Sequence, residues 1–214
     1  MKKIVFLLLL CVACCMNAQE FHLIPKVGLN LANTTGEVDS KVRPGLNIGL
    51  GGDVMLTERF GIETGVYYSM QGSKYKGGGV SYTDKLDYIN VPVYAKEFIY
   101  KGLYVFGGPQ FSFNVNSENK SSSDYGTTVI GMNVIRKFDC GVGLGAGYQF
   151  ERGLLISLNY NIGLINVNKS WASDSNPKAN NSVVQLNVGW RLHCKIKNIS
   201  LIINNRFVFV RTEQ

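Results

Sequence analysis

The stretch that most constrains the fold is GLLISLNYNIGL, at residues 153–164. From Leu154 to Leu164, apolar residues occupy every second position, and Ser157, Asn159 and Asn161 lie between them. Successive side chains of a β-strand point to opposite faces, so this period of two predicts a strand with one apolar and one polar face. The polarity of the two faces then indicates which environment each one meets.

Eight segments of the chain share this alternation. They lie at residues 23–33, 43–55, 60–71, 86–97, 102–115, 137–150, 154–166 and 182–192. Connections after the second, fourth and sixth segments are short, whereas those after the first, third, fifth and seventh are long and polar. Strictly alternating short and long connections predict an antiparallel up-and-down meander with all long loops at one end, which is the layout of an outer-membrane barrel.

Two kinds of eight-stranded barrel fit this pattern. A soluble lipocalin-type barrel has an apolar interior and a charged exterior, whereas a membrane barrel reverses the two faces. Here the non-apolar face carries glycine, serine and asparagine with few charges, which suits a narrow lumen better than a water-facing exterior. Strands in lipid must also close into a ring to pair their backbone groups. We therefore predict an all-β protein, an eight-stranded antiparallel up-and-down transmembrane β-barrel.

The N-terminal stretch MKKIVFLLLLCVACCMNAQ has the organisation of a secretory signal. Two lysines precede a short apolar core, and a small-residue site favours cleavage between Ala18 and Gln19. An uncleaved membrane anchor and a lipoprotein signal using one of the three early cysteines are the alternatives. The predicted organisation is a signal peptide at 1–18, a barrel at 19–192 and a C-terminal extension at 193–214, with the protein exported to the outer membrane.

Charge and cysteine content exclude several classes of function. The formal charge of +7 comes largely from the two ends of the chain, which leaves residues 20–192 nearly balanced and without a basic cluster, so we expect no nucleic-acid partner. Only Cys140 and Cys194 lie beyond the signal, and neither has metal-ligand spacing, so we expect no metal and no cofactor. A free Cys140 packed as a small hydrophobe is the simplest expectation.

Four stretches resemble a known family. They are FGIETGVYYSMQGSKY at 60–75, DYINVPVYAK at 87–96, LYVFGGPQFSF at 103–113 and QLNVGWRL at 185–192. They are similar to the Bacteroidetes-type outer-membrane β-barrel family often labelled PorT-like or porin family. The resemblance implies a small outer-membrane barrel and implies no settled biochemical activity.

The end of the chain departs from that family, whose members usually stop just after the last strand. Here 22 residues, HCKIKNISLIINNRFVFVRTEQ, follow Leu192, and their composition shifts to basic and Asn/Ile-rich. They form either a non-barrel extension or, through RFVFV, a replacement for the usual terminal assembly signal. Loss of membrane insertion on truncation after Leu192 would rule out the first hypothesis.

Chemistry-bearing residues are sparse. The two histidines, His22 and His193, lie outside the long loops, and no nucleophile motif or paired His-carboxylate motif occurs, so we expect no enzyme. Strand phase instead directs five charged side chains into the lumen near its periplasmic end. These residues are Lys26, Asp53, Glu63, Lys96 and Arg191. Buried charges need partners, and we predict a Glu63–Arg191 ion pair among them.

The charges allow two interpretations: a plug that fills the barrel, or a charged constriction in a narrow pore. Three functions follow from the sequence. The first is a structural or interaction role through the long external loops, the second a narrow channel for small solutes, and the third an enzyme. The expected partners are outer-membrane lipid and lipopolysaccharide, the barrel assembly machinery during insertion, and an extracellular or envelope protein. We expect a monomer.

Overall fold

The computed structural model describes residues 21–35, 40–77, 80–123, 126–131, 135–167 and 179–193. They form ten strands. The strands are β1 (Phe21–Thr35), β2 (Lys41–Met55), β3 (Phe60–Gly77), β4 (Val80–Tyr100), β5 (Leu103–Ser123), β6 (Gly126–Gly131), β7 (Phe138–Gln149), β8 (Leu154–Gly163), β9 (Asn180–Trp190) and β10 (Leu192–His193). Within these ranges, no helix has the length and apolar character needed to span a membrane.

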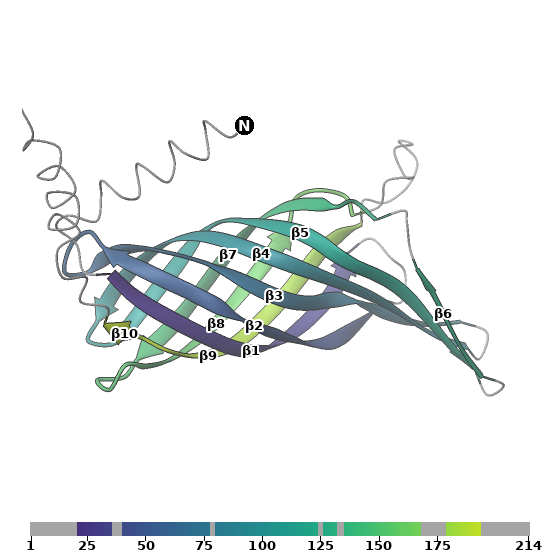
Figure 1. The fold of residues 1–214 in the computed structure, drawn as a ribbon, viewed down its shortest axis with the longest axis horizontal. Helices are drawn as coiled ribbons and strands as arrows, with labels where there is room; N and C mark the ends of the chain where they lie inside the picture. The colour runs from purple at the N-terminus through teal and green to yellow at the C-terminus, as the bar shows by residue number, and fades with distance from the viewer. Residues whose placement is uncertain are drawn as a thin grey trace, which may run out of the picture.

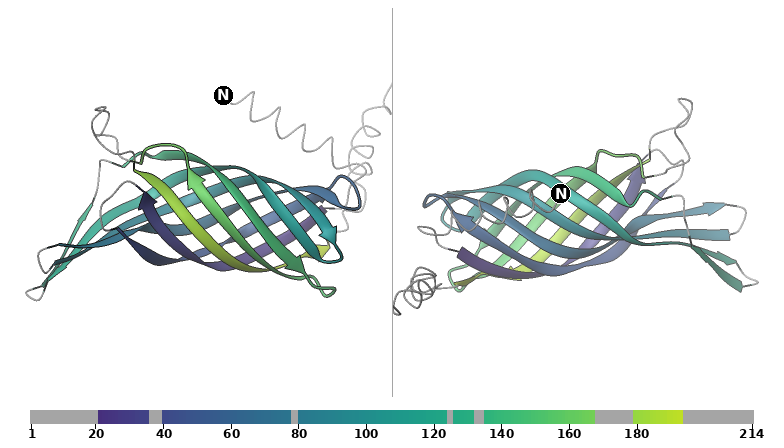
Figure 2. Two further views of the ribbon diagram at one scale, coloured as in Figure 1. Left: turned by 180° about the vertical axis from the view of Figure 1, so that it is seen from behind. Right: turned by 45° about the horizontal axis from the view of Figure 1, so that its top comes forward.

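Eight of the strands close into a barrel by their pairing, and the closed ring is visible in Figures 1 and 2. Each pairs antiparallel with its neighbour in the order β1, β2, β3, β4, β5, β7, β8 and β9, and β9 returns to pair with β1. The prediction of an eight-stranded antiparallel up-and-down barrel is therefore confirmed. The other two strands lie outside this ring: β6 pairs with β5, and β10 continues the line of β9 beside β1.

The closing seam is interrupted at one point. Lys26 faces Gly189 and, further along, Leu23 faces Leu192, but no backbone pairing joins the two strands between these positions. Pro25 lies in the gap, and proline has no N–H to donate to the ladder. The N–H of Arg191 donates instead to the carbonyl of Gly153, at 2.7 Å.

The apolar face of the barrel points outward. Exposed aliphatic and aromatic side chains cover every strand of the ring, whereas most buried side chains inside it are polar or charged. In β8, Leu158 is 55% exposed, and its neighbours Ser157 and Asn159 are buried. This inversion of an ordinary soluble core is what a lipid environment requires, and it excludes the lipocalin alternative.

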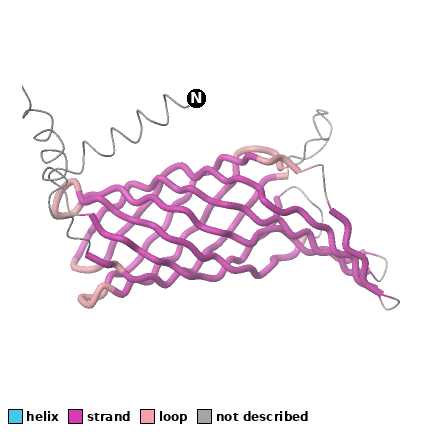
Figure 3. The backbone as a smooth tube through the Cα atoms, viewed as in Figure 1, coloured by secondary structure: helices cyan, strands magenta, loops and turns pink. Residues whose placement is uncertain are grey.

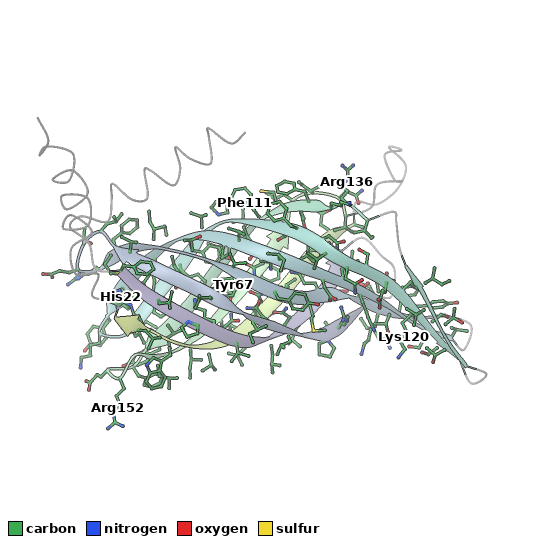
Figure 4. All side chains as sticks on the ribbon, viewed as in Figure 1. His22, Tyr67, Phe111, Lys120, Arg136 and Arg152 are labelled. Atoms are coloured by element: carbon green, nitrogen blue, oxygen red, sulfur yellow. The ribbon has the colours of Figure 1, made fainter. Side chains whose placement is uncertain are left out.

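Short turns gather at one end of the barrel (Figure 3). They join β2 to β3, β4 to β5 and β7 to β8. His22 and Arg152 lie at this end, and Arg136 and Lys120 lie towards the other (Figure 4). Because short turns of outer-membrane barrels face the periplasm, the end that holds His22 is the periplasmic end.

The third, fourth and fifth strands run further than the sequence predicts. The predicted ends at residues 71, 86 and 115 fall inside β3, β4 and β5, and residues 126–131 of the predicted fifth loop form β6. The outer parts of these strands leave the ring and extend to one side of it (Figures 1 and 2). We call residues 75–77, 80–88, 114–123 and 126–131 the projecting sheet.

Pro92 in β4 and Pro109 in β5 mark an interruption in the middle of the barrel wall. The pairing of β4 with β5 passes from Pro92 opposite Gln110 to Ala95 opposite Gly107 in the same register, and the two residues of each strand between them are not paired. Gly108 has φ +155°, and a Cβ there would lie 2.3 Å from the carbonyl oxygen of Val93. The Thr64 hydroxyl donates to the Pro92 carbonyl at 2.7 Å, which satisfies an acceptor beside the interruption.

Residues 1–20 and 194–214 lie outside the described residues. The predicted signal peptide, its Ala18–Gln19 cleavage site and all but the first residue of the predicted extension fall in these ranges. The backbone of His193, the first residue of that predicted extension, pairs with His22 in β1.

Candidate functional site: the charged lumen and the projecting sheet

The periplasmic part of the lumen holds a group of buried charges. The structure brings together all five residues that strand phase directs to this place, and it adds His22. We call this group the ion network: His22, Lys26, Asp53, Glu63, Lys96 and Arg191. Asp53 and Lys96 are 0% exposed and Glu63 is 4% exposed, so the network is almost completely shielded from solvent.

Two carboxylates connect the network. Asp53 accepts from Lys96 Nζ at 3.1 Å and from Arg191 Nη2 and Nε at 3.0 and 3.2 Å. His22 Nδ1 lies 3.0 Å from the same carboxylate. Glu63 accepts from Lys96 Nζ at 3.3 Å and from Lys26 Nζ. Lys96 therefore bridges the two carboxylates.

Strand register explains why these residues meet. His22 faces Asp53 across β1 and β2, and Asp53 faces Glu63 across β2 and β3. Lys96 lies opposite Gly61, two residues from Glu63, so both side chains point to the same side of the wall. Residues from distant parts of the chain thus occupy adjacent positions at one level of the lumen.

The predicted Glu63–Arg191 ion pair is wrong. Arg191 pairs with Asp53, and Glu63 pairs with Lys26 and Lys96. The position of each strand around the ring is the physical reason. Asp53 on β2 lies one strand nearer to the end of β9, where Arg191 lies, than Glu63 on β3, and the Glu63 carboxylate is already bound by Lys26 and Lys96. Strand phase alone assigns the face of each side chain and not the partner that it reaches.

Aromatic rings pack the lumen above the ion network. Tyr94, Tyr104 and Phe106 form a buried cluster, and Lys96 Nζ lies 4.3 Å from the centroid of the Tyr104 ring. These rings lie against inward-facing glycines: a Cβ on Gly145 would lie 2.5 Å from the ring of Phe106. The alternation of β7 predicts these inward glycines. It does not predict the opposing rings, because aromatics also favour the lipid-facing positions.

Side-chain amides cross the middle of the lumen in a hydrogen-bonded chain. Hydrogen bonds of 2.8 to 3.0 Å join, in this order, Asn47, Asn187, Asn159, Gln185, Asn161 and Tyr94. Tyr94 adds a contact of 3.0 Å to Gln110 on the neighbouring strand β5. Such a network satisfies buried polar groups and fixes their orientation.

Little free volume is left among these side chains. A cavity of about 30 Å³ lies between Lys26, Glu63, Tyr67 and the amide chain. A single water needs about 10 to 15 Å³ by this measure, so the cavity holds about two waters. A second cavity near Asp139 and Asn181, towards the outer end, measures about 10 Å³. These volumes suit ordered water and are far smaller than a continuous aqueous channel.

The projecting sheet is the second candidate site. Its last strand, β6, pairs with β5 along one edge, and no strand of the described residues pairs with its other edge. Every residue of β6 is exposed, including Val129 at 54% and Ile130 at 61%. Tyr75 and Tyr82 stack across the β3–β4 hairpin with ring centroids 5.0 Å apart, which supports the sheet outside the ring.

The closed ring, apolar exterior and filled polar lumen define the class of outer-membrane β-barrels. A family model described as the outer membrane protein beta-barrel domain matches residues 17–169. The chain belongs to this family, and its location is the outer membrane.

One solved structure shares the fold, and a second is reported beside it. Neisserial surface protein A has a TM-score of 0.51 and 12% identity, with 80% of this chain and 97% of that chain covered. Ail, the attachment invasion locus protein of Yersinia pestis, has a TM-score of 0.49 and 12% identity, with 81% and 99% covered. No curated protein sequence matches the chain significantly.

Proposed function

We propose that the protein is a closed outer-membrane barrel that presents the projecting sheet to a protein partner outside the cell. The observation that carries this proposal is the edge of β6 with which no described strand pairs. An edge strand displays a row of N–H and C=O groups that a partner's extended segment can pair with. Val129 and Ile130 add exposed apolar side chains to that edge. We propose no enzymatic activity and a monomeric barrel.

The filled lumen supports an interaction role over a channel. The ion network and the amide chain each cross the barrel, and the cavity between them holds about two waters. A narrow channel for small solutes would require these contacts to open. We therefore expect the purified protein in planar bilayers to give no sustained conductance. Sustained currents that change when Glu63 is replaced by Gln would contradict a closed barrel and support the channel.

The edge of β6 is tested by site-specific photo-crosslinking in intact cells. A photoreactive residue at position 130 is expected to give a discrete adduct with one protein, and Val129→Lys is expected to abolish that adduct because charge blunts strand edges. The matched control is Ser121→Lys in β5, which adds the same charge to a strand that is paired on both sides. An adduct that survives Val129→Lys, or is equally lost in Ser121→Lys, would contradict the proposed edge.

The sequence motifs described above support assignment to a particular group within the family. The N-terminal stretch supports a particular route of export to the outer membrane. We propose that the chain is a member of the PorT-like group, on the stretches around Glu63, Pro92 and Gly108. We also propose export by a signal cleaved after Ala18, insertion by the barrel assembly machinery, and contact with lipid and lipopolysaccharide. The intact mass of the mature protein checks the cleavage site, since a chain beginning at Gln19 has one defined mass.

A further inference from the structure

The ion network is not electrically balanced. Lys26, Lys96 and Arg191 carry three positive charges, whereas Asp53 and Glu63 carry two negative charges, and His22 adds none when neutral. A buried excess charge is costly unless a counter-charge lies close to it. Among the described residues no further carboxylate pairs with the network, so a group that enters from outside can supply the remaining counter-charge.

The periplasmic mouth is where such a group can enter. A cavity of about 600 Å³ lies between the β2–β3 and β4–β5 turns, and Arg191 belongs to its lining. We call this cavity the vestibule. Arg59 and Lys101 add two more cations to its wall, against the single carboxylate of Glu58. The vestibule thus adds further positive charge to the excess already present in the ion network.

The Arg191 guanidinium has unused N–H donors on the side of the vestibule. Its Nε and Nη2 both donate to Asp53, and Nη1 donates no hydrogen bond to another described residue. A guanidinium has five N–H donors in a planar fork that matches carboxylates. Its side chain is 10% exposed, so the unused donors lie at the boundary between the ion network and the vestibule.

We propose that the vestibule binds a small organic carboxylate from the periplasm, with Arg191 holding the carboxylate and Arg59 and Lys101 adding attraction. The volume is in the usual range for small-molecule sites. Phe98 and Tyr100 line the same cavity and supply an apolar wall for the body of the ligand. The carboxylate completes the charge balance of the ion network. This site is independent of the interaction role proposed for the projecting sheet.

The test uses benzoate as the probe and benzamide as its uncharged counterpart. Isothermal titration of the refolded full-length mature protein in detergent is expected to show saturable binding of benzoate and none of benzamide. The double variant Arg59→Gln, Lys101→Gln is expected to weaken benzoate binding about tenfold, because two charged contacts are lost at roughly 0.7 kcal/mol each. Both residues are exposed on turns, so the barrel itself is expected to fold.

The matched control is Arg152→Gln. Arg152 is an exposed cation on the third periplasmic turn and does not line the vestibule. Unchanged benzoate affinity in this variant, beside weakened affinity in the double variant, supports the site. Three results would overturn it: no saturable binding of benzoate, equal binding of benzamide, or equal weakening by Arg152→Gln.

Discussion

Glu63→Gln is expected to lower the free energy of unfolding by about 3 to 5 kcal/mol, the usual cost of removing one partner from a buried ion pair. The change leaves Lys26 without its carboxylate, and Lys96 keeps only Asp53. It also doubles the excess positive charge of the ion network. Equilibrium unfolding by denaturant in lipid vesicles measures the change. A second measurement is the difference in gel migration between unheated and boiled samples, which reports the folded barrel.

A double variant tests whether Glu63→Gln lowers stability through the excess charge of the ion network or through altered packing. Adding Lys26→Met to Glu63→Gln removes one charge of each sign and restores the original excess, so most of the lost stability is expected to return. Glu58→Gln is the control, because Glu58 is exposed on a periplasmic turn. If Glu63→Gln unfolds at the same denaturant concentration as the parent, the ion network contributes nothing to stability.

Gly145→Val is expected to prevent folding or to lower the unfolding free energy by about 3 kcal/mol or more. A Cβ at this position would lie 2.5 Å from the Phe106 ring and 2.6 Å from both the Asn159 Cβ and the Leu158 carbonyl oxygen. The carbonyl belongs to the backbone of the neighbouring strand and has no rotamer by which to move away. Overpacking of a filled interior is destabilising even where side chains adjust. Gel migration and denaturant unfolding detect the loss.

Gly131→Val is the matched control for this change. A Cβ at Gly131 has no heavy atom within 4 Å, and the residue lies at the end of β6 outside the ring. Its variant is therefore expected to fold and unfold like the parent. Equal stability of the Gly145 and Gly131 variants would show that the lumen is looser than its glycine contacts indicate.

The sequence predicts the ring because each strand of the barrel wall faces lipid on one side and the lumen on the other, and its residues alternate accordingly. In β8, the alternation of Leu158 with Ser157 and Asn159 predicts both the strand and its lipid-facing side. The short turns predict which end of the strand lies at the periplasm. Exposure of Leu158 and burial of Ser157 confirm that assignment. A period of two assigns the face of each side chain and not the partner that its charge reaches inside the ring. Asp53 on β2 lies one strand nearer to Arg191 than Glu63 on β3, so Arg191 pairs with Asp53 instead of the predicted Glu63.

The sequence does not predict the projecting sheet, because apolar and polar residues no longer alternate in these segments. Beyond the membrane both faces of a strand meet water, so the polar run NSENKSSS at 116–123 is typical of a loop although it forms part of β5. Pairing holds it there: Lys120 faces Thr83 on one side and Val129 on the other. Tertiary pairing overrides local preference in such segments.

The length of the projecting sheet determines how far β6 lies above the membrane surface. β5 leaves β7 after Phe113 pairs with Phe138, and the nine residues of β4 from Val80 to Tyr88 continue past this level. They amount to about 30 Å of strand. A tilt near 40° leaves roughly 20 Å of this length along the bilayer normal. The headgroup layer is only about 6 Å thick on each side, so β6 stands clear of it. A large molecule that approaches the cell from outside therefore contacts β6 before it reaches the lipid surface.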